Sequence, residues 1–155
     1  MPPPIVALDR LTQRLEDRAI VDALTFAIAE GGVFGLLGHN GAGKTTTLNM
    51  LTTLARPASG AATIAGADLV RDPDGVRRNI GFVPENVRLY DTLTAEENLS
   101  FFARLSGVEA PDRRVREVME LLDCTSYAQR RVGSFSKGMR QRIGLAQAIL
   151  HKPKV

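Results

Sequence analysis

The 155-residue sequence predicts an α/β fold in which a β-rich first part leads into a largely helical second part. Two runs of β-branched and aromatic residues, 5–11 and 19–29, have the composition of strands. An apolar run, Val33 to Leu37, then enters a glycine-rich loop and a helix. From Thr94 onward, apolar residues recur at helical spacing. With 44% hydrophobic residues, the chain can bury the core of one domain.

Composition argues against several classes of protein. No apolar run approaches the roughly 20 residues of a membrane-spanning helix, and Met1 to Pro4 lacks the basic and apolar regions of a signal peptide. Cys124 is the only cysteine, so we expect no internal disulfide, a reducing cytoplasmic setting and a small core residue. The net charge is a mild +3, and no aromatic residues alternate with the arginines. We therefore interpret the arginine clusters as solvated faces and expect no nucleic-acid partner. These clusters are Arg113, Arg114 and Arg116, and Arg130 and Arg131.

The elements of the first part follow from local signals. The runs 5–11 and 19–29 are expected to pair as a hairpin, and residues 30–32 turn the chain into the strand over 33–37. A helix should begin at Lys44 and end before Pro57, because proline cannot continue the backbone ladder.

Three shorter elements are expected next. Two turn signals, Ser59-Gly60 and Ala65-Gly66, bracket a short strand over 61–64. Asp72-Pro73 starts a brief helix that ends near Arg78. A buried strand over 80–83 is expected to stop at Pro84.

The helical part begins with a capping box. The Thr94 hydroxyl and the Glu97 carboxylate are spaced to satisfy each other's backbone amides. Gly107 should end this helix, and Pro111 should begin another. The apolar stripes of the two helices are interpreted as core. They comprise Leu99, Phe102, Ala103 and Leu105, and Val115, Val118, Met119, Leu121 and Leu122.

The glycine-rich loop fits the pattern G-x-x-x-x-G-K-[ST] between a strand and a helix. Glycines allow backbone amides to turn inward around a phosphate, and the helix N-terminus attracts the anion. Lys44 would neutralise the β- and γ-phosphates, and the Thr45 hydroxyl would ligate Mg²⁺. The alternative is a glycine-rich turn with a solvated lysine. The candidate residues for the nucleotide are Gly38, His39, Asn40, Gly41, Ala42, Gly43, Lys44, Thr45 and Thr46.

A second motif precedes the last predicted helix. In Phe135-Ser136-Lys137-Gly138-Met139, Ser136 is placed as an N-cap, with a glycine two residues later. The segment therefore predicts a second helix N-terminus that can receive an anion. The alternative is an ordinary capped amphipathic helix.

Together the two motifs resemble those of the ATP-binding subunits of ABC transporters. The resemblance extends from Ile5 to Val155 and places a Walker A region at 33–51, a Q-loop region at 81–85 and the signature motif at 135–142. The stretch 89–99 is most similar to exporters of the ABC-2 type. The resemblance implies a P-loop NTPase fold. Its nucleotide-binding core would comprise residues 1–85 and 132–155, and its helical subdomain residues 86–131.

The family also implies a head-to-tail dimer that holds two ATP molecules with Mg²⁺. Ser136, Lys137, Gly138 and Met139 would then act on ATP bound by a second ATPase subunit. Closure of the dimer would drive a separate transmembrane permease, so we expect the chain at the inner face of the cell membrane, in contact with the membrane only through that permease.

Some positions depart from the family pattern. Leu15 stands where an aromatic residue usually stacks on adenine, and Glu85 stands at the Q-loop glutamine, where a carboxylate could still ligate Mg²⁺. Lys137 and Met139 replace a glycine and a glutamine of the signature.

The chain stops before the family's positions for the Walker B aspartate and the catalytic glutamate, so no complete catalytic set is expected in it. The strand that carries them would pair beside 33–37, and the isolated polypeptide is therefore expected to be marginally stable or prone to aggregate.

Three functions remain open at this point. The first is an ATPase subunit that couples MgATP binding and hydrolysis to export. The second is a nucleotide-binding module without turnover, and the third is an ABC ATPase of DNA repair or translation.

Overall fold

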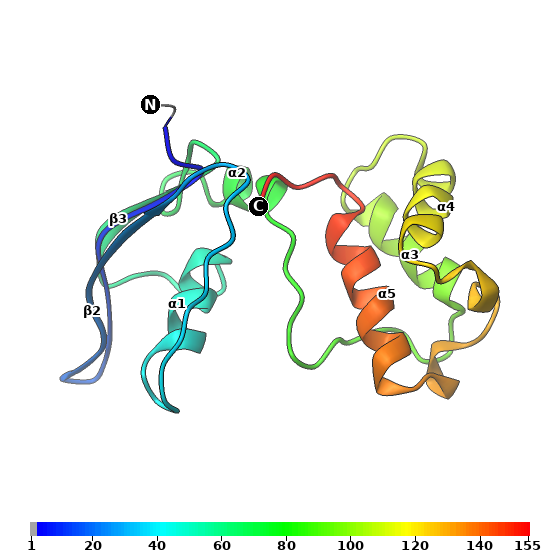
Figure 1. Cartoon of the computed structure of the whole chain (residues 1–155), viewed down its shortest axis with the longest axis horizontal. Helices are drawn as coiled ribbons and strands as arrows, with labels where there is room; N and C mark the ends of the chain where they lie inside the picture. Colours follow the sequence, from blue (N-terminus) through cyan, green and yellow to red (C-terminus); the bar gives the residue numbers. More distant parts are fainter. Residues whose placement is uncertain (1–2) are drawn as a thin grey trace. The chain divides into compact units, whose positions relative to one another are not determined.

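A computed structural model describes residues 3–155 and divides the chain into two compact units. The first unit comprises the described residues up to Ile80 together with Lys154 and Val155, and the second comprises Gly81 to Pro153. Figure 1 shows the strands in the first unit and the bundle of helices in the second. Each unit has a hydrophobic core of its own.

The first unit contains a four-stranded antiparallel sheet in the order β2-β1-β3-β4. Its strands are β1 (Val6–Leu15), β2 (Arg18–Ile28), β3 (Ser59–Ile64) and β4 (Ala67–Asp68). The predicted hairpin is confirmed, since β1 pairs with β2 from Val6 opposite Ile28 to Leu15 opposite Arg18. The predicted strand over 61–64 is also present as β3, whereas the two-residue β4 was not predicted from the sequence.

Two short helices complete the first unit. Helix α1 (Lys44–Leu51) follows the glycine-rich loop, and its Met50 is fully buried in the core beneath the sheet. The helix ends at Leu51, earlier than predicted, because the chain turns at Thr53 with a left-handed φ of 63°. Helix α2 (Pro73–Asn79) begins as predicted, with the Asp72 carboxylate accepting a hydrogen bond from the Gly75 amide.

Two predicted strands are absent from the described chain. Residues 33–37 and 80–83 have no strand structure, and no backbone hydrogen bond joins 33–37 to another segment of residues 3–155. A strand needs a neighbouring backbone to satisfy its amides and carbonyls. Without that neighbour, the side chains of Val33 and Leu37 are 103% and 93% exposed, and Phe34 is 47% exposed with its ring stacked on Phe26.

The second unit is built from helices. They are α3 (Ala95–Leu105), α4 (Pro111–Leu121), the short 3₁₀ turns η1 (Thr125–Tyr127) and η2 (Val132–Ser134), and α5 (Lys137–Ile149). The capping box predicted at Thr94 and Glu97 is confirmed in both directions. Most residues of the predicted stripes are buried. The prediction is wrong for Leu105 and Leu121, which are 72% and 70% exposed at the last position of their helices.

Helix α5 packs within the second unit. Its Ile143 and Ala146, together with Leu150, join the core that α3 and α4 form. The division into a nucleotide-binding core of residues 1–85 and 132–155 and a helical subdomain of residues 86–131 stays a prediction, and the second compact unit comprises residues 81–153. Cys124 is fully buried in this core, as expected.

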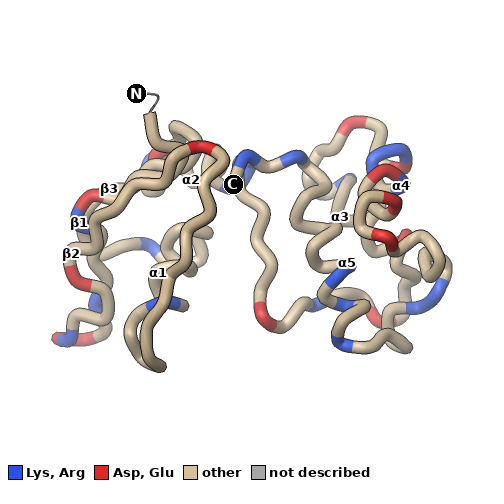
Figure 2. Tube along the Cα trace, viewed as in Figure 1, with Lys and Arg blue, Asp and Glu red and all other residues tan. Residues whose placement is uncertain are grey.

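One of the arginines interpreted as solvated has a structural role. Figure 2 shows charges of both signs along α4. Within that helix, the Arg114 side chain is only 17% exposed, and its guanidinium donates to the carbonyls of Ile149 and Leu150 at 2.9 and 3.0 Å. Arg114 therefore caps the C-terminus of α5, where carbonyls lack helical partners.

Candidate functional site: a phosphate-binding loop and a second capped helix

The glycine-rich loop reaches α1 through two left-handed residues. Gly41 and Gly43 have φ of 84° and 82°, which L-residues with a side chain rarely adopt. At Gly43 a Cβ atom would also lie 2.6 Å from the carbonyl oxygen of Ile20. Strand β2 thus fixes the base of the loop, and only glycine fits there.

Lys44 folds back over the loop that precedes it. Its ammonium donates to the carbonyl oxygens of Gly38 and His39 at 2.6 and 2.8 Å. The Ala42 amide donates to the His39 carbonyl at 3.2 Å, which closes a tight turn. Because an ammonium has three N–H donors, Lys44 can hold the loop with two of them and offer the third to an anion.

The threonines after Lys44 divide into two kinds. The Thr47 hydroxyl is buried and donates to the Gly43 carbonyl at 2.9 Å, so it belongs to the helix. The Thr45 side chain is exposed, and its hydroxyl makes no hydrogen bond within residues 3–155. A free hydroxyl oxygen is a ligand that suits Mg²⁺, which otherwise keeps water and phosphate oxygens around it.

The first turn of α1 has free backbone amides. The first helical hydrogen bond runs from the Thr47 amide to the Gly43 carbonyl at 2.8 Å, and no side chain caps the N-terminus. The amides of Lys44, Thr45 and Thr46 therefore remain available, and no acidic residue lies in this turn. The loop and helix together favour a phosphate group.

The second motif forms the N-terminus of α5 in the second unit. The Ser136 hydroxyl accepts a hydrogen bond from the Met139 amide at 3.3 Å, which confirms the predicted N-cap. Ser136, Lys137 and Gly138 are exposed, whereas Met139 is half-buried and packs against the core. The turn again has no acidic residue of its own.

Two further predicted positions are exposed. Leu15 is 68% exposed at the end of β1, and Glu85 is exposed in the second unit. Within residues 3–155, no three acidic, histidine or cysteine side chains gather into a metal-binding group.

Sequence reasoning missed Asn98 and Arg140. Asn98 is fully buried on α3, and its side-chain amide forms hydrogen bonds with the backbone of Tyr90 and Thr94. Arg140 on α5 forms an ion pair with Asp91 at 2.8 Å. A signal for Asn98 was present, since an amide directly before Leu99 falls on the apolar face of the helix. Arg140 gave no such signal, because its partner is 49 positions away.

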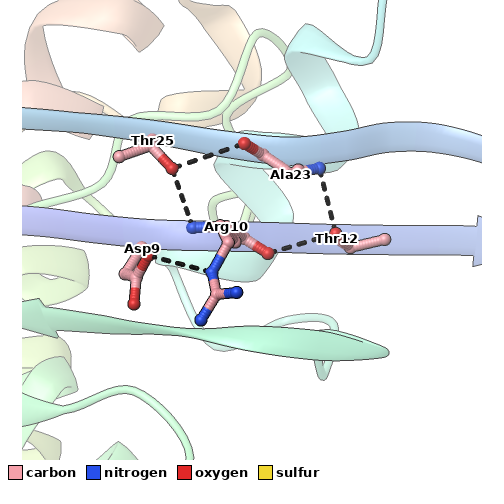
Figure 3. Close-up of polar contacts among 5 residues, drawn as sticks. All are labelled: Asp9, Arg10, Thr12, Ala23 and Thr25. Atoms are coloured by element: carbon pink, nitrogen blue, oxygen red, sulfur yellow. Dashed lines mark hydrogen bonds and ion pairs between the residues drawn. The ribbon is translucent and has the colours of Figure 1, made fainter.

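A shallow hollow lies on the sheet, outside the phosphate-binding loop. It has a volume of about 440 Å³ and an open mouth. Its lining residues are Asp9, Arg10, Thr12, Ser59, Gly60 and Ala61. Figure 3 shows how the polar groups of this region are used: Arg10 and Thr12 bond to each other and to β2, and Arg10 pairs with Asp9. The hollow follows from a bulge in the sheet.

None of the helices in residues 3–155 is both long and apolar enough to cross a membrane. Comparison with known proteins identifies similar chains among the ATP-binding proteins of ABC transporters. The "Doxorubicin resistance ATP-binding protein DrrA" of Mycobacterium tuberculosis is 44% identical over 137 residues, which is 87% of this chain and 41% of that protein. More generally, the chain spans about half the length of the curated relatives it matches.

Solved structures agree with this result. A structure described as the ATP-binding subunit of an ABC transporter has a TM-score of 0.85 and 30% identity, and the match covers 96% of this chain and 63% of that one. A dimeric ATP-binding cassette in a post-hydrolysis state, bound to ADP and Pi, has a TM-score of 0.80 and 26% identity, with 96% and 70% covered. These likenesses confirm the predicted α/β fold of the ABC ATPase type. The family model described as "ABC transporter" matches residues 21–155, and the chain therefore belongs to the ABC transporter family of ATP-binding proteins.

Proposed function

We propose that this chain binds MgATP in the loop 38–46 and forms part of an ATPase that energises export through a separate permease. The observation that carries the proposal is the arrangement at Lys44: two of its N–H donors hold the loop, and the third, together with free amides of the first turn of α1, can receive phosphate oxygens. All nine predicted nucleotide-binding residues belong to this one segment. They are Gly38, His39, Asn40, Gly41, Ala42, Gly43, Lys44, Thr45 and Thr46.

Mg²⁺ would bind together with the nucleotide. The free Thr45 hydroxyl is its ligand from the loop, and the Glu85 carboxylate is a second candidate. The ion would neutralise part of the phosphate charge, as metal ions do in other phosphoryl-transfer sites.

A second ATPase subunit would complete the site. The exposed Ser136, Lys137 and Gly138, with the Met139 backbone, would contact ATP bound by that subunit in a head-to-tail dimer. Two helix N-termini both carry partial positive charge, so they can meet at one point only while the triphosphate of ATP lies between them, and hydrolysis would loosen the dimer. The relative that is dimeric with ADP and Pi bound supports the pairing of two such subunits.

Export through a permease is supported by the relatives. One similar protein is described as a doxorubicin resistance protein and another as a bacitracin transport protein. By analogy with them, this chain would act at the inner face of the cell membrane and contact the membrane only through its permease.

Two other functions are separable from export by experiment. A nucleotide-binding module without turnover would bind ATP and release no phosphate. A non-transport ABC ATPase of DNA repair or translation would hydrolyse ATP without a permease.

The test is a comparison of ATP binding with phosphate release, made on the protein as its own cell makes it, with its intact mass measured first. We expect Lys44→Ala to abolish both, because the loop loses its cation and two of its internal hydrogen bonds. Lys154→Ala is the matched control, since that exposed lysine lies outside the loop. Tight binding by Lys44→Ala would contradict the proposed site. Binding without phosphate release above that variant would favour the module without turnover.

A further inference from the structure

The segment after Glu85 lies against the segment that leads into α5. The Gly133 amide donates to the Asp91 carbonyl at 3.0 Å, and the Val132 amide donates to the Leu93 carbonyl at 3.0 Å. The Ala95 amide donates to the Arg130 carbonyl at 3.2 Å. Residues 91–95 and 130–133 are thus joined antiparallel by backbone bonds, although about 40 positions separate them in sequence.

An ion pair extends this connection into α5 itself. Arg140 Nη1 lies 2.8 Å from Asp91 Oδ1. Arg140 is one helical turn after Ser136, and its side chain is 28% exposed, compared with 63% for Asp91. Asp91 therefore binds the chain on both sides of the Ser136 cap. Its carbonyl accepts from the Gly133 amide before the cap, and its carboxylate pairs with Arg140 after it.

The backbone beside Asp91 is itself fixed. The buried Asn98 side chain accepts from the Tyr90 amide at 2.8 Å and donates to the Tyr90 carbonyl at 3.1 Å. It also donates to the Thr94 carbonyl at 2.9 Å. With three hydrogen bonds and no exposure, Asn98 attaches the segment around Asp91 firmly to α3.

The Arg140–Asp91 ion pair also offsets unfavourable positive charge at the N-terminus of α5. The first turn of α5 contains Lys137 and Arg140 and no acidic residue. Cations at a helix N-terminus are unfavourable, because the amides there already carry partial positive charge. The Asp91 carboxylate offsets this at Arg140, while Lys137 stays exposed.

We propose that Arg140 and Asp91 are positioning residues for the signature helix. Their ion pair sets the direction of the first turn of α5 relative to segment 86–93, so that the amides of this turn are held ready for ATP bound by the partner subunit. The inference rests on the proposed function, and it names two residues that sequence reasoning did not select. Neither side chain needs to touch the nucleotide.

Mixing of two marked chains tests this role. In a head-to-tail dimer, a Lys44→Ala chain paired with an Arg140→Gln chain retains one site in which both halves are intact. When both substitutions are on the same chain and its partner is unaltered, neither site is intact. We therefore expect MgATP-dependent association to be preserved in the first mixture and weaker in the second, by about fivefold, the upper range for a partly exposed ion pair. A merely structural effect of Arg140→Gln would weaken both mixtures equally, and that result would overturn the inference.

Two further variants sharpen the test. Exchanging the charges with Asp91→Arg and Arg140→Asp on one chain should restore association to within about twofold of the unaltered chain, if the pair itself matters. The matched control is Arg104→Gln, which removes another ion pair of the second unit, to Asp112 at 3.2 Å, and should have no effect. An equal effect of Arg104→Gln would overturn the inference. If MgATP does not promote association of the unaltered chain, the proposed function fails, and the inference fails with it.

Discussion

Thr12 and Thr25 hold β1 and β2 together through matching hydrogen bonds (Figure 3). The Thr25 hydroxyl accepts from the Arg10 amide at 2.9 Å, and the Thr12 hydroxyl accepts from the Ala23 amide at 3.0 Å. Each hydroxyl also donates to a carbonyl on its own strand. Arg10 and Ala23 both have left-handed φ, 49° and 46°, which takes their amides out of the ladder. The two threonines thus satisfy the amides that this bulge leaves unpaired.

Replacement of Thr25 by valine should loosen this part of the hairpin. The Arg10 amide would lose its partner, at a cost of about 0.5–1.5 kcal/mol. We expect faster hydrogen exchange at the Arg10 amide, measured by NMR. Thr25→Ser keeps the hydroxyl and serves as the control. Equal protection of that amide in the valine and serine variants would contradict the prediction.

Substitution of the loop glycines should separate backbone strain from steric overlap. Gly43→Ala meets both, because φ is 82° and the new Cβ would lie 2.6 Å from the Ile20 carbonyl oxygen. Gly41→Ala has a similar φ but nothing within 4 Å of its Cβ. We expect ATP binding, measured by calorimetry, to be lost in Gly43→Ala and weakened by about tenfold in Gly41→Ala, since left-handed backbone costs about 1–2 kcal/mol. Equal affinities of the two variants would show that β2 does not fix the loop.

Asn98→Ala should destabilise the second unit. It removes the Asn98 oxygen that accepts from the Tyr90 amide and opens a small cavity in the core. Each buried polar group left unsatisfied costs about 1–3 kcal/mol, so we expect a loss of about 2 kcal/mol in the free energy of unfolding, measured with urea. Asn86→Ala, at an exposed asparagine of the same unit, is the control. A loss no larger than that of the control would show that Asn98 is not needed to fix Tyr90.

Local sequence patterns correctly predicted the elements whose hydrogen-bond partners lie close to them in sequence. The capping box at Thr94, the cap at Ser136 and the hairpin each depend on residues close in sequence, and all three formed. The elements that failed depend on a distant neighbour. The run 33–37 has strand composition but no adjacent backbone within residues 3–155.

The same distinction applies to the site. The motif around Lys44 correctly predicted a loop followed by a helix N-terminus, because this geometry depends on residues close together in sequence. Arg114 was interpreted as part of a solvated face and Arg140 was not singled out, since the carbonyls that Arg114 caps and the carboxylate that Arg140 pairs with lie 35 or more positions away.

Because of Cys124, the free energy of unfolding of the second unit should decrease as pH rises through the alkaline range. Burial raises the pKa of its thiol above the ordinary value, and Sγ lies 3.4 Å from the Met119 carbonyl. A raised pKa in the folded state means that the stability is fully present below the pKa of the unfolded thiol and is lost as pH rises toward the folded value. We expect Cys124→Ala to show a smaller decrease in the free energy of unfolding above pH 9.0, the ordinary pKa of a cysteine thiol, measured with urea. A slope unchanged by the substitution would contradict this and point to Tyr127, whose pKa burial also raises.

The exposed apolar run at 33–37 should limit the behaviour of the isolated 155-residue polypeptide. Val33 and Leu37 are almost completely exposed, and Phe34 lies half-exposed beside them, so the run presents apolar side chains and unpaired backbone together. Such a segment is a site where chains associate. We expect scattering on heating and a low, irreversible melting transition, and we expect Leu37→Lys to reduce the scattering because charge opposes association. Leu121→Lys is the control, since that leucine is exposed on a helix and offers no unpaired backbone. A sharp, reversible melt of the unaltered monomer at high temperature would show that the run is harmless.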